Sequence, residues 1–71
     1  MAEKIRYTII YSWTHEVFGN RKTTAQGAAT AEATRQMIEG IRRDMYGYKP
    51  RDFKIYAQRG TEPRVLIHQE G

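Results

Sequence analysis

Large apolar side chains alternate with more polar ones near the start of the chain. The apolar positions are Ile5, Tyr7, Ile9, Tyr11 and Trp13. Because successive side chains in a β-strand point to opposite faces, this spacing predicts a strand with one buried side. The alternation continues through residues 15–17 to Gly19-Asn20, a dipeptide that readily forms a tight turn. We therefore expect a long hairpin whose polar return strand, residues 21–28, forms a sheet edge.

From Thr30 onward the apolar period becomes helical. The apolar positions lie three and four residues apart, at Ala33, Met37, Ile38, Ile41 and Met45. This spacing predicts an amphipathic helix. Thr30 is suited to cap its first turn, and Gly47 is suited to end it. A glycine inside a helix costs about 1 kcal/mol relative to alanine, so Gly40 indicates a close approach between helix and sheet.

Two further strands are expected after the helix. Pro50 makes the connection stiff and favours extended backbone at Lys49. Apolar and polar side chains alternate again over residues 53–58, which predicts a third strand. Gly60 and Pro63 then mark a turn before a short fourth strand over residues 64–68.

These elements predict one domain over residues 1–71, of the α+β class, with the order ββαββ. Strands with one apolar side and a helix with one apolar stripe bury both surfaces when a four-stranded antiparallel sheet carries the helix on one face. The other face is then open to solvent. If the third strand pairs with the first, the strand order is 2-1-3-4. Pairing at the other edge satisfies the same pattern, so the order stays open.

Length and composition exclude several classes of protein. A chain of 71 residues, 39% of them apolar, forms a single small domain and does not enclose a substrate cavity. The absence of cysteine excludes a disulfide framework, a thiolate zinc site and a cysteine nucleophile. No apolar run is long enough for a membrane span or a signal peptide. We therefore expect a cytoplasmic protein that does not engage a membrane.

The residues that could support catalysis are sparse. The only serine, Ser12, is expected on the solvent side of a regular strand, without the base that a nucleophile needs. The two histidines, His15 and His68, lie far apart and belong to no metal-binding motif. Asp44 and Asp52 lie among basic residues, which indicates local ion pairing. The sequence therefore predicts a protein that is not an enzyme and has no cofactor or metal.

Positive charge is concentrated in the middle of the chain. The net charge is +4, and residues 21–59 hold nine basic residues against four acidic ones. Such a region attracts polyanions or acidic protein surfaces, although small domains also carry net charge for solubility alone. Within it, basic residues alternate with tyrosines. The candidate site residues are Arg42, Arg43, Tyr46, Tyr48, Lys49, Arg51, Lys54 and Tyr56.

Basic side chains pair with phosphates and aromatic rings stack on bases, so this group predicts contact with a nucleic-acid backbone. Lys54 and Tyr56 are expected to share the open sheet face with Arg6, Thr8 and Ile10, which would make that face a platform for a single strand. DNA and RNA are not distinguished. The leading hypothesis is a small, basic, non-catalytic module that binds nucleic acid.

The alternative hypothesis is docking on another protein. In size and topology alone the chain resembles small cysteine-free phage proteins that inhibit or modulate host enzymes and complexes. Exposed aromatic residues dominate the binding energy of such interfaces, and the candidates are Trp13, Phe18, Tyr46 and Tyr48. Trp13 is also expected in the core. A monomer or a dimer through residues 21–28 or the final strand is compatible with the unpaired strand edges.

Overall fold

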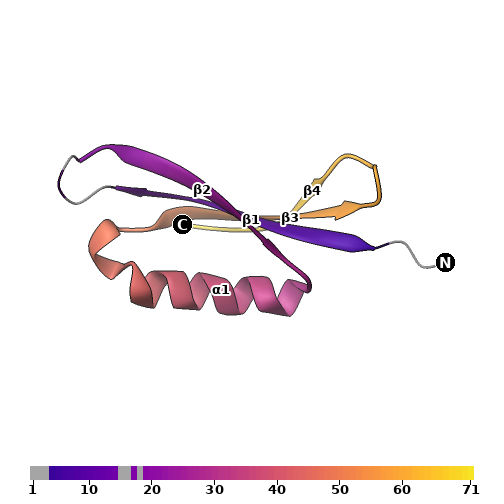
Figure 1. Ribbon diagram of the computed structural model, residues 1–71, viewed down its shortest axis with the longest axis horizontal. Helices are drawn as coiled ribbons and strands as arrows, with labels where there is room; N and C mark the ends of the chain where they lie inside the picture. The colour runs from indigo at the N-terminus through magenta and orange to yellow at the C-terminus, as the bar shows by residue number, and fades with distance from the viewer. Residues whose placement is uncertain (1–3, 15–16, 18) are drawn as a thin grey trace.

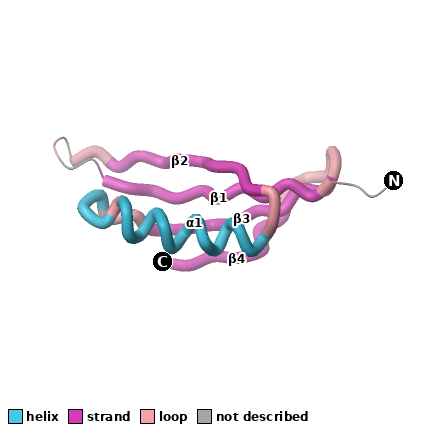
Figure 2. Tube along the Cα trace, turned by 60° about the horizontal axis from the view of Figure 1, so that its bottom comes forward, coloured by secondary structure: helices cyan, strands magenta, loops and turns pink. Residues whose placement is uncertain are grey.

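The order of elements is ββαββ, as the sequence predicts. The computed structural model describes residues 4–14, 17 and 19–71. The elements are β1 (Ile5–Thr14), β2 (Arg21–Ala28), α1 (Ala31–Asp44), the 3-10 turn η1 (Tyr46–Tyr48), β3 (Arg51–Arg59) and β4 (Val65–Glu70). The strands form one antiparallel sheet in the order β2-β1-β3-β4 (Figures 1 and 2), so β3 pairs with β1. The single helix runs along one side of the sheet (Figure 1).

The core lies between α1 and the two central strands. Its buried residues are Ile9 and Tyr11 of β1, Ile38 and Ile41 of α1, and Phe53 and Ile55 of β3. Ten residues of strand extend about 33 Å, whereas fourteen residues of helix extend about 21 Å. The helix therefore cannot cover the whole of β1. Tyr7 and Trp13 are half-buried and Ile5 is 38% exposed, so the expectation that this entire side of the strand is buried was wrong at its start.

The cap and the apolar face of α1 follow the sequence signal, with Ile38 and Ile41 buried, whereas the predictions for Gly40 and Gly47 fail. The Thr30 hydroxyl accepts a hydrogen bond of 3.0 Å from the backbone N–H of Ala33, which confirms the cap. The helix ends at Asp44, and Gly47 lies within η1 instead of ending the helix. A Cβ atom at Gly40 would meet nothing nearer than Arg43 Nη2 at 3.9 Å. The predicted close approach between helix and sheet at Gly40 is therefore wrong.

Lys49 and Asp52 have left-handed backbone conformations, with φ of 50° and 59°. The extended backbone predicted for Lys49 is wrong, because its N–H donates to the carbonyl of Tyr46 (3.3 Å) and so closes η1. Asp52 lies where the pairing of β1 with β3 shifts register, so this strand start is irregular. Gly19, in the hairpin connection, also has a positive φ of 69°, whereas residues 15, 16 and 18 lie outside the described residues.

Candidate nucleic-acid interface

Two rows of side chains cross the sheet on the face away from α1. The first row consists of Gly27, Thr8, Tyr56 and Leu66, in the order β2-β1-β3-β4. The second row consists of Ala25, Ile10, Lys54 and Gln69 in the same order. Arg6 is paired with Gln58 on the same face. The prediction that Lys54 and Tyr56 share a face with Arg6, Thr8 and Ile10 is confirmed, and we call this surface the open face.

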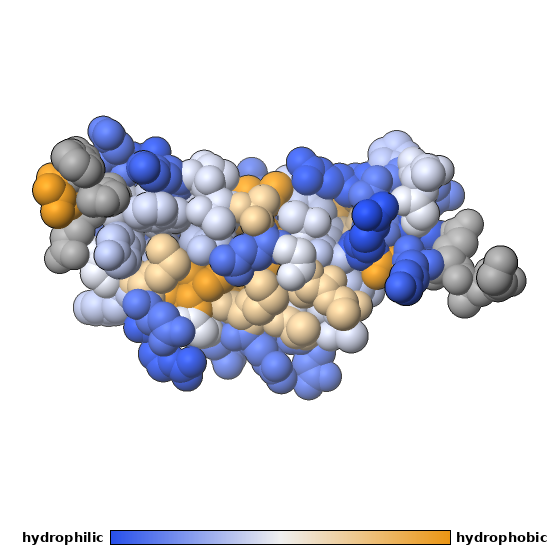
Figure 3. Space-filling view, viewed as in Figure 1, coloured by the Kyte–Doolittle hydropathy of each residue, from blue (hydrophilic) through white to orange (hydrophobic). Residues whose placement is uncertain are grey.

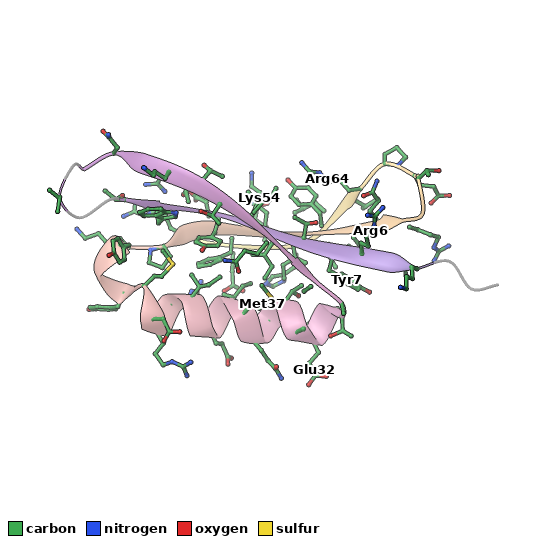
Figure 4. The ribbon with its side chains drawn as sticks, viewed as in Figure 1. Arg6, Tyr7, Glu32, Met37, Lys54 and Arg64 are labelled. Atoms are coloured by element: carbon green, nitrogen blue, oxygen red, sulfur yellow. The ribbon has the colours of Figure 1, made fainter. Side chains whose placement is uncertain are left out.

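Three basic side chains project from the open face. Figure 4 shows Arg6, Lys54 and Arg64 on the side of the sheet opposite α1, whereas Tyr7 and Met37 lie between sheet and helix. In the described part of the chain, none of these three cations is ion-paired with a carboxylate. The Arg64 guanidinium carbon lies 4.7 Å from the centroid of the Tyr56 ring. The open face thus presents unpaired positive charge around a tyrosine.

A polar cluster lies at one end of the open face. Arg21 Nη2 is 2.8 Å from both Ser12 Oγ and Asp52 Oδ2, and the Ser12 hydroxyl donates to Asp52 Oδ2 at 3.2 Å. Ser12 faces this side, as expected, but it is buried beneath the pair instead of exposed, and its strand is irregular there. The Arg21 charge is neutralised by Asp52, so this cluster braces β2, β1 and β3 and adds little to the positive charge of the face.

Several of the other predicted site residues have structural contacts on the helix side. Arg42 Nη2 lies 2.7 Å from Glu70 Oε1, and its guanidinium carbon lies 5.0 Å from the Phe53 ring centroid. Arg43 is paired with the neighbouring Asp44 at 3.3 Å.

Tyr48 packs against the aromatic rim of the core. Its ring meets that of Trp13 edge-on, with 5.5 Å between centroids, and Trp13 Nε1 donates to Thr24 Oγ1 at 2.9 Å. Trp13 is packed against the core, as predicted. Tyr48 therefore packs at the rim of the core, a role that tyrosines near helix ends commonly have.

A shallow hollow of about 500 Å³ lies at the end of the helix. It is lined by Arg42, Tyr46, Gly47, Lys49 and Pro50, and Tyr46 is 84% exposed. We call it the helix-end hollow.

Arg51 is exposed at the start of β3, and its carbonyl accepts a hydrogen bond from Ser12. The eight predicted residues therefore do not form one surface, because Lys54 and Tyr56 lie on the open face and the helix-end residues lie elsewhere.

Sequence reasoning missed Arg64 and did not place Arg6 in the site. Arg64 lies in a tail with a net negative charge and Arg6 in a neutral segment, so counting charge by segment concealed both. The alternation of β1 does assign Arg6 to the open face. Gly60 and Pro63 predict the turn between β3 and β4, but they do not indicate that this turn places Arg64 over Tyr56.

Most of the described acidic side chains lie on the helix side of the sheet, away from the open face. Three of them, Glu32, Glu39 and Asp44, lie on α1, and Glu70 reaches Arg42 on the helix side of β4. Figure 4 shows Glu32 on the outer side of the helix, away from Lys54 and Arg64. Figure 3 shows hydrophilic residues on both outer sides and an apolar band between sheet and helix. Most of the described negative charge therefore lies on the helix side, and Asp52, at one end of the open face, is paired with Arg21.

Comparisons with known proteins add no family. No family model, curated protein or solved structure matches the chain. Within the described residues, no helix is long and apolar enough to cross a membrane, and no group of three or more acidic or histidine side chains could hold a metal ion. His15 and Phe18 lie outside the described residues.

Proposed function

We propose that this protein is a non-catalytic module that binds single-stranded nucleic acid on the open face. Arg6, Lys54 and Arg64 contact phosphates, and a base stacks on the pair formed by Tyr56 and Arg64. The observation that carries the proposal is an uncovered sheet face on which unpaired cations surround a tyrosine ring.

The spacing of these groups suits a single strand. Residues two apart on a strand lie about 7 Å from each other, and neighbouring strands are about 4.8 Å apart. Lys54 therefore lies one step along β3 from Tyr56, while Arg6 comes from the adjacent β1. A base held at Tyr56 would have a cation within reach in several directions, so its flanking phosphates could each be neutralised.

Arg64 extends the stacking surface outward. Its guanidinium group lies over the Tyr56 ring, and guanidinium planes themselves stack on bases. A base can therefore stack on the pair formed by Tyr56 and Arg64 without displacing either side chain. Such stacking tolerates any base, because every base has a π-face. The proposed binding is accordingly weakly selective for sequence.

Fluorescence anisotropy with labelled single-stranded DNA and RNA oligonucleotides, repeated over a salt series, tests the proposal. Three phosphate contacts predict a slope of log K against log salt of about −2. Lys54→Gln should weaken binding and reduce that slope by about 0.7. Arg35→Gln, an exposed charge removal on α1, should leave both unchanged. Binding that is absent at low salt, indifferent to salt, or equally sensitive to both variants would contradict the proposal.

Docking on an acidic protein surface is a second candidate function, and the helix-end hollow favours it. Tyr46 is the most exposed aromatic side chain in the described structure, and Lys49 lines the same hollow. Exposed tyrosines beside cations are frequent anchors of protein interfaces. A host enzyme or complex modulated in this way would be retained on the immobilised protein after nuclease treatment, and Tyr46→Ala should release it while Tyr56→Ala should not.

A further inference from the structure

The β4 edge of the sheet exposes a continuous apolar segment. Val65, Leu66 and Ile67 are 61%, 43% and 48% exposed, and among the described residues no strand lies beyond β4. The edge of a sheet presents unpaired backbone N–H and C=O groups, and an apolar edge is a template on which another strand can add. We call this segment the β4 edge; Leu66 lies on the open face, but none of the three residues is among those proposed to contact phosphates or bases.

The opposite edge of the sheet differs in composition. β2 begins with Arg21 and Lys22 and continues with small and polar residues. Charged side chains on an edge oppose strand addition, because pairing would bring like charges together. β4 contains no arginine or lysine between Val65 and Glu70. The two edges are therefore unequal: charge opposes strand addition at the start of β2, whereas at β4 the one opposing feature described is the register shift with β3 between Leu66 and His68.

We infer that the β4 edge pairs with the β4 edge of a second copy of this chain, antiparallel and about a two-fold axis. The partner of this edge must supply a short strand that is apolar and carries little positive charge. β4 itself meets that requirement. The chain as a whole has a net charge of +4, but residues 60–71 contain one arginine and two glutamates, of which Glu70 is paired with Arg42, so this edge brings little net charge of either sign to a contact between two copies.

Pairing of this kind would close the assembly at two copies. A two-fold contact uses the same surface on both partners, so no second β4 edge remains free. The result is an eight-stranded sheet with the charged β2 strands at its outer edges. The open faces of both copies lie on the same side of that sheet, because an antiparallel pair about a two-fold axis perpendicular to the sheet keeps equivalent faces together.

The size of the contact sets its strength. One strand of six residues buries much less than the roughly 1,600 Å² of a standard interface. We therefore expect a reversible dimer, present at high protein concentration and dissociated on dilution. Its formation does not depend on the proposed function, because strand addition uses the backbone groups of the β4 edge and not the side chains of Arg6, Lys54 or Tyr56.

Sedimentation velocity of nuclease-treated protein over a wide concentration range tests the inference. The weight-average sedimentation coefficient of the wild type should rise with concentration toward that of a dimer. Val65→Lys and Ile67→Lys should each keep the protein monomeric, whereas Ala25→Lys on β2 should dimerise normally. Circular dichroism melting shows whether each variant is folded. Because both replaced side chains are exposed, we expect the fold to be retained.

A cysteine cross-link provides a second measurement, since the native chain has no cysteine. Ile67→Cys should form a disulfide-linked dimer under mild oxidation, and Ala25→Cys should not, because paired strands bring Cα atoms within disulfide range. A wild type that stays monomeric at every concentration would overturn the inference. So would equal cross-linking of both variants, or assembly beyond two copies. The nucleic-acid proposal would be unaffected by any of these outcomes.

Discussion

The guanidinium group of Arg64 lies over the phenol ring of Tyr56, with 4.7 Å between its central carbon and the ring centroid. The turn between β3 and β4 makes this contact. Gly60 adopts a φ of 56°, and the Gln58 side chain donates to the carbonyl of Glu62 at 3.0 Å. A pair of this kind at an exposed site contributes about 0.5–1 kcal/mol. The turn thus joins a cation and a ring into one unit at the centre of the open face.

Tyr56 should contribute stacking energy to nucleic-acid binding. Loss of one base-stacking ring costs about 1–3 kcal/mol, which is roughly 5- to 150-fold in affinity. Tyr56→Ala should weaken oligonucleotide binding by that factor in fluorescence anisotropy, and Tyr56→Phe should retain most of it. Tyr46→Ala at the helix-end hollow is the control. A larger loss with Tyr46→Ala than with Tyr56→Ala would move the binding site to the helix end.

Thr30 should stabilise α1 through its cap. The hydroxyl accepts the Ala33 N–H at 3.0 Å, and removal of such a cap typically costs about 1 kcal/mol. Thr30→Ala should lower the melting temperature by about 4–8 °C in a domain of this size. Thr61→Ala, in the exposed turn before β4, should change stability by less than about 0.5 kcal/mol. Equal shifts for the two variants would show that the cap contributes nothing.

Arg42 should matter for stability more than its neighbour Arg43. Arg42 contacts both Glu70 and the Phe53 ring, whereas the ion pair of Arg43 within the described residues is with its exposed neighbour Asp44. Arg42→Ala should lower the free energy of unfolding by about 1 kcal/mol, and Arg43→Ala by less than about 0.5 kcal/mol. Urea denaturation at low and high salt measures both, and salt should reduce the Arg42 effect in part. Identical losses would contradict a structural role for Arg42.

The alternating residues of β1 and the helical period after Thr30 were enough to predict the order of elements. Each signal comes from residues that are neighbours in the chain, and the burial of Ile9 and Tyr11 follows from it. The prediction of extended backbone at Lys49 was wrong because a hydrogen bond outweighed a local backbone preference. A preference for extended backbone before proline is weak, and closing η1 onto Tyr46 outweighs it.

In the candidate site too, features that depend on neighbouring residues could be predicted, whereas contacts between residues far apart in the chain could not. Lys54 and Tyr56 could be assigned to one face because alternation along a strand is local. Arg42 could not be separated from them by sequence, since nothing in the chain shows that Glu70 and Phe53 meet its guanidinium group. Proximity in sequence placed these basic residues in one group, and folding distributed them over two sides of the sheet.

Local sequence signals thus determined the class of fold, the helix cap and the buried sides of β1 and β3. The strand order, the open face and the β4 edge were decided by the pairing of β1 with β3, which brings Arg6 beside Gln58 and Thr8 beside Tyr56. Several arrangements of the same strands satisfy the apolar pattern equally well. Only the packing of the helix and the hydrogen bonding of distant strands select one of them, because those interactions join residues that the chain itself keeps far apart.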